Sequence, residues 1–311
     1  MEKREQDNQT PRSIRIYRKL RYVLAALVLL ILAAAVAQVV HIFREYWRSE
    51  DAYRAVTEAY VLPPRTPRPA SQQNATPVPG GNGQTGDATP GPNGETPEGP
   101  EETPAPGEPG ATPAPQQPGE PPEFAPFSVD FDSLRAMNGE CVGWISIPDT
   151  GVNYPVMLTT NNSKYLDILP DGSKNSSGSI FMDCRCEADL SETNTVIYGH
   201  HMNNGTMFAP LDRFLGKSFF NEHRVAYYLT PDADYKITFI ACMRVEADGE
   251  AYDIYTSEEE LQSYLETALR NAPVSAGTDV NGIDRIVTLS TCSGRRGIRT
   301  IVIGTVRRIG E

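Results

Sequence analysis

Cysteine and histidine are the side chains of this sequence best suited to nucleophilic catalysis, and both are scarce. The 311 residues include five cysteines and four histidines. Cys292 differs from the other cysteines because it follows the apolar run 286–291 and precedes a loop that contains glycine and two arginines. A partly exposed, electropositive strand end lowers the pKa of a thiol and favours the nucleophilic thiolate. The context therefore indicates a nucleophile, with a structural thiol as the alternative.

The other four cysteines have contexts that favour packing. Cys141 precedes the first expected strand and Cys242 lies inside an apolar run, which is typical of small core residues. Cys184 and Cys186 resemble half of a metal site, but no second Cys or His pair lies at zinc spacing. Two residues apart, they are also poorly placed for a disulfide. We expect packing for this pair too, with a redox or metal role as the alternative.

Two of the four histidines are candidates for a catalytic base. His41 lies at the end of an apolar segment and His223 in a polar loop, so neither is expected to take part. His200 and His201 follow the β-branched run 195–198 and precede an Asn/Gly loop. A Cys–His pair supplied by two strand ends is a nucleophile–base arrangement. Spacing alone does not decide which of the two imidazoles faces the thiol.

A cation completes the set. Arg299 begins an apolar strand seven residues after Cys292. If the strands on either side of the loop pair antiparallel, Arg299 lies beside the cysteine, where it can stabilise a tetrahedral oxyanion. Arg295 and Arg296 in the loop are competitors for that role, or they form a solvated basic turn.

Charge and composition exclude some functions. The net charge is −12, and most of the excess acid lies after residue 122, so the domain lacks the basic surface of a nucleic-acid-binding protein. The acidic run Glu258–Glu260 suggests the first turn of a helix, where carboxylates complement the macrodipole, rather than a metal site.

An apolar segment near the N-terminus predicts a membrane anchor. Residues 22–43 carry no acidic or strongly basic side chain, and 22 residues at about 1.5 Å each span roughly 30 Å of hydrocarbon. Lysine and arginine are concentrated in residues 1–21, which predicts a cytoplasmic N-terminal tail and an extracellular C-terminal part. Tyr46 and Trp47, in a juxtamembrane segment 44–62, suit an interfacial anchor. A cleaved signal peptide is the alternative, but no small-residue cleavage site follows the run.

Residues 63–122 have the composition of a disordered linker. They contain 18 of the 26 prolines and no aromatic residue, so they cannot bury enough apolar surface to fold. We expect a tether with a typical span of about 45 Å. Residues 123–311 are long enough for one domain.

Beyond the linker, short apolar runs alternate with turn signals. A short helix is expected over 129–137, and a second over 257–270, where Ser257 and Glu260 match the capping-box spacing. The expected strands are 142–147, 152–157, 179–182, 195–198, 224–229, 234–245, 285–290 and 299–306. About eight strands with one inserted helix predict a mainly β barrel or sandwich.

Several of these segments resemble the sortase family, and within it class B. Thr288-Leu-Ser-Thr-Cys292 is similar to the family's TLxTC signature, with an arginine at the start of the next strand. The segments 197–202 and 204–208 resemble the class B histidine segment, and 143–147, 153–156 and 178–183 match further class B blocks in the same order. The resemblance covers about residues 127–309.

The resemblance implies a fold and a chemistry. The fold would be an eight-stranded β barrel with an N-terminal helix and one inserted helix. Cys292 would attack the carbonyl of a threonine in the C-terminal sorting motif of a secreted protein. His200, directly after Tyr-Gly, would protonate the leaving amine and then activate an amine of a peptidoglycan precursor or a pilin lysine. Arg299 would hold the oxyanion. No cofactor and no metal are implied.

The resemblance also implies a substrate groove. Ser290 and Thr291 would line it, Asn162 would match a groove asparagine, and the backbone N–H of Ser293 would help to bind the oxyanion. Two other functions remain open at this point: a Cys–His peptidase acting on cell-wall peptides, and a non-enzymatic wall-associated module.

Overall fold

The computed structural model describes residues 12–64, 123–292 and 297–310. The helices are α1 (Arg12–Tyr60), α2 (Phe131–Met137), α3 (Lys217–Glu222) and α4 (Glu258–Asn271), with short 3-10 turns η2 (Lys164–Leu166), η3 (Ala209–Leu215) and η4 (Glu250–Tyr252). The strands are β1 (Val61–Leu62), β2 (Ser128–Val129), β3 (Cys141–Ile147), β4 (Val152–Met157), β5 (Ile180–Met182), β6 (Asn194–Gly199), β7 (Val225–Leu229), β8 (Asp234–Glu246), β9 (Val274–Ser275), β10 (Ile286–Cys292) and β11 (Ile298–Ile309). The linker residues 65–122, where disorder is expected, lie outside these ranges.

One sheet contains nine of these strands, in the order β11-β10-β6-β5-β4-β3-β7-β8-β9. β11 also pairs antiparallel with β8, which closes eight strands into a barrel and leaves β9 outside it. Two of the pairings, β4 with β5 and β6 with β10, are parallel. The expectation of an eight-stranded barrel with one inserted helix is confirmed.

The barrel interior is filled by alternate side chains of the strands, as expected when one face of each strand turns inward. Ile145, Val156, Ile197, Phe239 and Val287 belong to one buried cluster and are fully inaccessible to solvent. A second cluster lies between the sheet and the inserted helix α4, and a third lies beneath α2. Because both faces of several strands are covered, their sequences are continuous apolar runs.

The inserted helix begins as its sequence predicts, with one difference in its cap. Ser257 Oγ accepts from the backbone N–H of Glu260 at 3.2 Å. The carboxylate of Glu260 does not return to Ser257 as in a capping box. It accepts instead from the backbone N–H of Thr256 at 2.9 Å and from the Thr256 hydroxyl at 2.7 Å.

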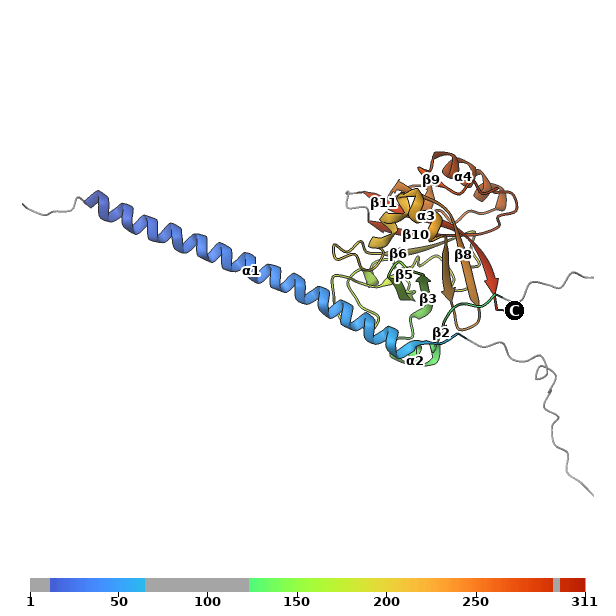
Figure 1. The fold of residues 1–311 in the computed structure, drawn as a ribbon, viewed down its shortest axis with the longest axis horizontal. Helices are drawn as coiled ribbons and strands as arrows, with labels where there is room; N and C mark the ends of the chain where they lie inside the picture. The colour runs from blue at the N-terminus through green and yellow to red at the C-terminus, as the bar shows by residue number, and fades with distance from the viewer. Residues whose placement is uncertain (1–11, 65–122, 293–296, 311) are drawn as a thin grey trace, which may run out of the picture. The chain divides into compact units, whose positions relative to one another are not determined.

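The first helix extends far beyond the apolar segment. α1 is uninterrupted from residue 12 to residue 60 (blue in Figure 1), so the segment 44–62 continues the helix of the apolar run. By length and composition it is the one described helix able to cross a membrane, and its apolar side chains from Tyr17 to Phe43 are exposed. This exposure suits contact with lipid rather than with a protein core.

The C-terminal part of α1 packs on the barrel. Tyr53 is buried, its hydroxyl donates to the carbonyl of Gly178 at 2.6 Å, and its ring meets that of Tyr154 edge-on at 5.0 Å. Val56 is also buried, in the cluster that contains Trp144. The helix therefore carries a second apolar stripe after the membrane segment, and that stripe belongs to the core of the domain.

The chain on either side of the linker is joined by a two-stranded sheet. Val61 in β1 pairs with Val129 in β2, and the Ser128 hydroxyl donates to the carbonyl of Pro63 at 2.8 Å. A linker whose two flanks are hydrogen-bonded to each other does not set the distance between the anchor helix and the barrel. The expectation that residues 63–122 are a tether between them is therefore wrong. The pairing also explains why the helix expected from residue 129 begins only at Phe131.

Candidate active site

Three strand ends meet at one rim of the barrel. β10 and β11 are antiparallel, with Cys292 opposite Arg299, as expected from the sequence. β6 runs parallel to β10, with Gly199 opposite Thr291. One residue further along each strand, this register brings His200 beside Cys292. The parallel pairing is the feature that joins the histidine segment to the cysteine segment, although more than 90 residues separate them.

A close packing contact fixes the strand end that carries the histidine. A Cβ atom built on Gly199 would lie 2.5 Å from Ile180 Cδ1 and 2.6 Å from Phe208 Cγ. Only glycine fits between these two side chains. Gly199 therefore lets the end of β6 pass close to Phe208 in the segment that follows. His200 comes directly after this strand end.

A cavity of about 270 Å³ lies at this rim and collects most of the expected site residues. His200, Arg299, Ser290 and Asn162 all line it. Its remaining walls come from Leu166, Phe181, Tyr198, Gly199, Ala247 and Tyr252. Thr291 is buried beside it, and its hydroxyl has no hydrogen-bond partner among the described residues. Ser293, Arg295 and Arg296 lie outside the described residues.

The two neighbouring histidines have different surroundings. His200 Nε2 lies 2.7 Å from the carbonyl oxygen of Leu166. A carbonyl only accepts, so Nε2 carries the hydrogen in this contact and Nδ1 of the neutral ring is the basic nitrogen. His201 Nε2 lies 3.2 Å from Asp212 Oδ2 and lines a different cavity. The structure thus separates two imidazoles that spacing could not distinguish.

The remaining histidine and the arginine also have defined positions. His223 Nδ1 lies 2.9 Å from the carbonyl of Phe219, and the two rings stack at 4.0 Å. Arg299 is partly buried, and its Nη1 donates to the carbonyl of Ile298 at 3.3 Å. Among the described residues the guanidinium makes no other hydrogen bond, so its remaining N–H groups can donate to a ligand in the cavity that Arg299 lines.

Sequence reasoning missed a buried carboxylate behind the cavity. The Asp183 side chain is 1% exposed. It accepts from Tyr198 OH at 2.8 Å, from Asn162 Nδ2 at 3.1 Å and from Arg185 Nε at 2.9 Å. Asn162 Oδ1 in turn accepts from the backbone N–H of Cys184 at 2.8 Å. Asp183 therefore orients two lining side chains, Tyr198 and Asn162, and the signal available in the sequence was an acid directly after a short strand.

These contacts affect the ionisation of both partners. Burial alone would raise the pKa of Asp183, but hydrogen bonds from Arg185 and Tyr198 outweigh it and hold the pKa below its ordinary value. Burial and the hydrogen bond to Asp183 raise the pKa of Tyr198. At neutral pH, Asp183 is therefore an anion and Tyr198 a neutral donor.

A second aromatic side chain shapes the same wall. The Tyr252 hydroxyl lies 2.9 Å from Ser290 Oγ, and its ring stacks on Tyr198 at 6.1 Å with an interplanar angle of 20°. Arg185 Nη2 donates to the carbonyl of Tyr252 at 2.8 Å. The Asp183 network thus reaches Ser290 through Tyr252.

Replacing Asp183 with asparagine is expected to lower the free energy of unfolding by about 1–3 kcal/mol, because a buried, charge-assisted set of hydrogen bonds is weakened. The contribution of a carboxylate with a lowered folded-state pKa is present above its unfolded pKa, about 3.9, and is lost as the pH falls through the lower folded value. Urea denaturation between pH 7 and pH 3 should show the difference between parent and variant shrinking with acidification. A difference independent of pH would contradict this role.

Three of the four described cysteines other than Cys292 are buried, but one is not. Burial raises the pKa of Cys141 and of Cys186 to about 12, and it also raises that of Cys242. Such thiols stay neutral and are poor nucleophiles. Cys184 is exposed, so the expectation of packing is wrong for this residue. It follows β5 in a turn, where the side chain points to solvent while the backbone N–H holds Asn162.

No group of three or more His, Cys, Asp or Glu side chains within residues 12–64, 123–292 and 297–310 is arranged to hold a metal ion. The acidic run Glu258–Glu260 forms the first turn of α4.

The closed barrel, with cysteine, histidine and arginine at three adjoining strand ends, defines a class of protein. The sortase domain model matches residues 145–306. The chain is 32% identical over 180 residues to sortase B of Staphylococcus aureus (58% of this chain and 74% of that protein), and 35% identical over 162 residues to sortase B of Listeria monocytogenes (51% and 65%).

Solved structures agree with these relatives. The Staphylococcus aureus sortase B–substrate complex matches with a TM-score of 0.55 at 29% identity, covering 58% of this chain and 85% of that one. A sortase B-like protein of Bacillus anthracis matches with a TM-score of 0.53 at 34% identity, covering 57% and 82%. The chain therefore belongs to the sortase family, as a class B member. Membership implies a transpeptidase.

Proposed function

We propose that this protein is a membrane-anchored cysteine transpeptidase that cleaves a C-terminal sorting motif of secreted proteins and transfers the acyl part to an amine. The observation that carries the proposal is the convergence of Cys292, His200 and Arg299 at the ends of three adjoining strands. The Staphylococcus aureus sortase B has been solved as a complex with substrate, which supports substrate binding by the shared fold.

The proposed first step is acyl transfer to the cysteine. The thiolate of Cys292 attacks the carbonyl carbon of a threonine in the sorting motif, and the carbonyl oxygen becomes an oxyanion. Arg299, which lines the cavity, stabilises that oxyanion, and the backbone N–H of Ser293 adds a second donor. The C–N bond then breaks as His200, which carries the proton lost by the Cys292 thiol, gives that proton to the leaving amine, and a thioester remains on Cys292.

The proposed second step restores the enzyme. His200, now neutral, takes a proton from an incoming amine, and the amine nitrogen attacks the thioester carbonyl. The C–S bond breaks, an amide forms, and the thiolate of Cys292 is regenerated. The acceptor would be a peptidoglycan precursor or a pilin lysine. Transfer exceeds hydrolysis where a positioned amine is a better competitor for the thioester than water.

The groove residues have distinct proposed parts. Asn162 uses both its carbonyl and one N–H within the protein, so we assign it to the wall rather than to direct recognition. Ser290, whose hydroxyl is held by that of Tyr252, is assigned to the lining of the groove. Thr291 is buried, which suits a role in orienting the C-terminal end of strand β10.

The membrane-spanning segment of α1 supports a catalytic domain on the extracellular side of the membrane. α1 has one apolar stretch of membrane-spanning length, and the basic residues gather before it, which favours an N-terminus in the cytoplasm and a catalytic domain outside. Secreted proteins and cell-wall amines are found on that side.

A peptide library offered to the full-length protein in detergent tests this function. We expect intact-mass spectrometry to find an acyl group on Cys292, and ligation products only when an amine is added. Hydrolysis at an equal rate with and without amine would favour the peptidase alternative. No covalent intermediate and no cleavage would favour a non-enzymatic module.

A further inference from the structure

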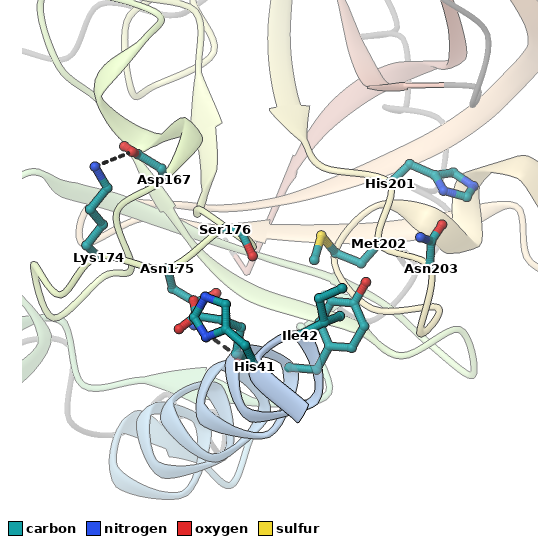
Figure 2. Close-up of a pocket in the computed structure, with 11 residues that line it drawn as sticks. His41, Ile42, Asp167, Lys174, Asn175, Ser176, His201, Met202 and Asn203 are labelled. Carbon is teal, nitrogen blue, oxygen red and sulfur yellow. Dashed lines mark hydrogen bonds and ion pairs between the residues drawn. The ribbon is translucent and has the colours of Figure 1, made fainter. Parts of the chain in front are cut away.

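A second and larger cavity, of about 800 Å³, lies between α1 and the barrel. Figure 2 shows its walls: His41 and Ile42 from the helix on one side, and two barrel loops, carrying Asp167 to Ser176 and His201 to Asn203, on the others. None of its lining residues has a part in the chemistry proposed above.

The cavity lies where α1 leaves its apolar segment. His41 and Ile42 are among the last residues of the run 22–43, and Glu45 and Tyr46 line the cavity just beyond its end, after Arg44. Asn175 Nδ2 donates to the carbonyl of Glu45 at 3.1 Å, so the loop is held against the helix at this level. Tyr53 of α1, which is buried against the barrel, lies about 15 Å along the helix from the end of the apolar run at residue 43, at about 1.5 Å per residue. A molecule seated in the membrane surface can therefore reach the cavity.

The two cavities share a wall. Leu166 and His200 line the smaller cavity, and the residues that directly follow them, Asp167 and His201, line the larger one. The hydrogen bond from His200 Nε2 to the carbonyl of Leu166 lies at this boundary. The larger cavity therefore lies next to the strand end that carries the imidazole proposed to activate the acceptor amine.

The lining suits a cationic, hydrogen-bonding ligand. Two carboxylates, Glu45 and Asp167, contribute to it. Lys174 pairs with Asp167 at 3.2 Å (Figure 2), whereas Glu45 takes part in no ion pair among the described residues. Asn175, Ser176 and Asn203 add neutral polar groups. An ammonium group is attracted by the carboxylate of Glu45, and the amides and hydroxyl can hold the peptide or sugar that bears it.

From these observations we infer that the larger cavity binds the amine acceptor of the transfer reaction, presented from the membrane surface, and delivers its amine to His200. This inference rests on the function proposed above and deepens it. The acceptor enters between α1 and the barrel, while the sorting peptide occupies the smaller cavity. The anchor helix is thereby one wall of the acceptor site as well as a membrane attachment.

The test separates the two half-reactions in the full-length protein, reconstituted in nanodiscs of phosphatidylglycerol and phosphatidylcholine. The sorting peptide that acylates the enzyme is supplied with hydroxylamine, which is small enough to reach the thioester without a binding site, or with triglycine or Nα-acetyl-lysine amide as larger amines. Glu45→Gln and the cavity-filling Ser176→Trp are compared with Glu58→Gln, which replaces an exposed carboxylate on the same helix outside the cavity.

We expect Glu45→Gln and Ser176→Trp to raise the KM for the larger amine about fivefold or more, with hydroxamate formation within twofold of the parent, and Glu58→Gln to match the parent throughout. Transfer by both cavity variants at the parental rate, or a parent that forms hydroxamate but uses neither amine, would overturn the inference. If the parent protein forms no hydroxamate, the proposed function is instead rejected. A defect in nanodiscs that is absent in detergent would indicate a phospholipid headgroup as the occupant and would also overturn the inference.

Discussion

Replacing Cys292 with alanine is expected to abolish acyl-enzyme formation and to lower peptide cleavage by about 1,000-fold or more, because no other group can form the covalent intermediate. The buried cysteines have raised pKa values and stay protonated, so they cannot substitute for it. Intact-mass spectrometry after incubation with the sorting peptide should show the acyl adduct on the parent and none on the variant. A fluorogenic form of the same peptide gives the loss in rate.

Cys184→Ala is the matched control, since Cys184 is the exposed thiol among the other four. Its contact with Asn162 is made by the backbone N–H, which alanine retains. We expect the control to form the adduct at the parental rate. An adduct on Cys292→Ala, or its loss in Cys184→Ala, would show that the nucleophile has been assigned to the wrong residue.

The second large effect concerns the histidine pair. His200→Ala is expected to lower peptide cleavage by about 100- to 10,000-fold, the usual range for removal of a general acid–base group. His201→Ala should keep cleavage within about tenfold of the parent, because the interaction lost is a partly exposed pair with Asp212. Cleavage is measured with the fluorogenic peptide, and circular dichroism checks that each variant is folded.

His223→Ala serves as a third member of this series, since its ring stacks on Phe219 away from both cavities. We expect near-parental cleavage from it. The reverse result, an inactive His201→Ala with an active His200→Ala, would move the base to the neighbouring residue. It would also imply that the hydrogen bond between His200 and Leu166 is a structural contact only.

The strands show how far local pattern reaches. Every expected strand is present, and most ends agree within one or two residues, because alternation and apolar runs are properties of short segments. Two pairings were decided by contacts distant in sequence. β11 pairs with β8 to close the barrel, and β6 pairs parallel with β10. Neither pairing leaves a signal within its own strand.

The anchor illustrates the opposite case. Residues 44–62 contain charges of both signs, and their composition does not indicate that they pack against the barrel. Only the barrel surface around Tyr154 and Gly178 makes Tyr53 a core residue. A tether was the natural interpretation of a proline-rich segment, and it failed because the flanks of that segment pair with each other. The pairing of β1 with β2 and the packing of Tyr53 on the barrel are tertiary contacts, which the local composition of these segments does not reveal.

The sequence by itself determined the presence of a membrane-spanning segment, the set of strands, and the small number of side chains able to perform covalent catalysis, because each depends on residue type and short-range order. For the histidine pair the sequence offered only a family resemblance, and tertiary structure placed His200 rather than His201 in the cavity with Arg299. Tertiary structure alone decided that Asp183 holds the wall of that cavity and that α1 bounds a second cavity. The physical reason is that side-chain direction at a strand end depends on which neighbouring strand it pairs with and in what register, and that choice is made by packing of the whole barrel.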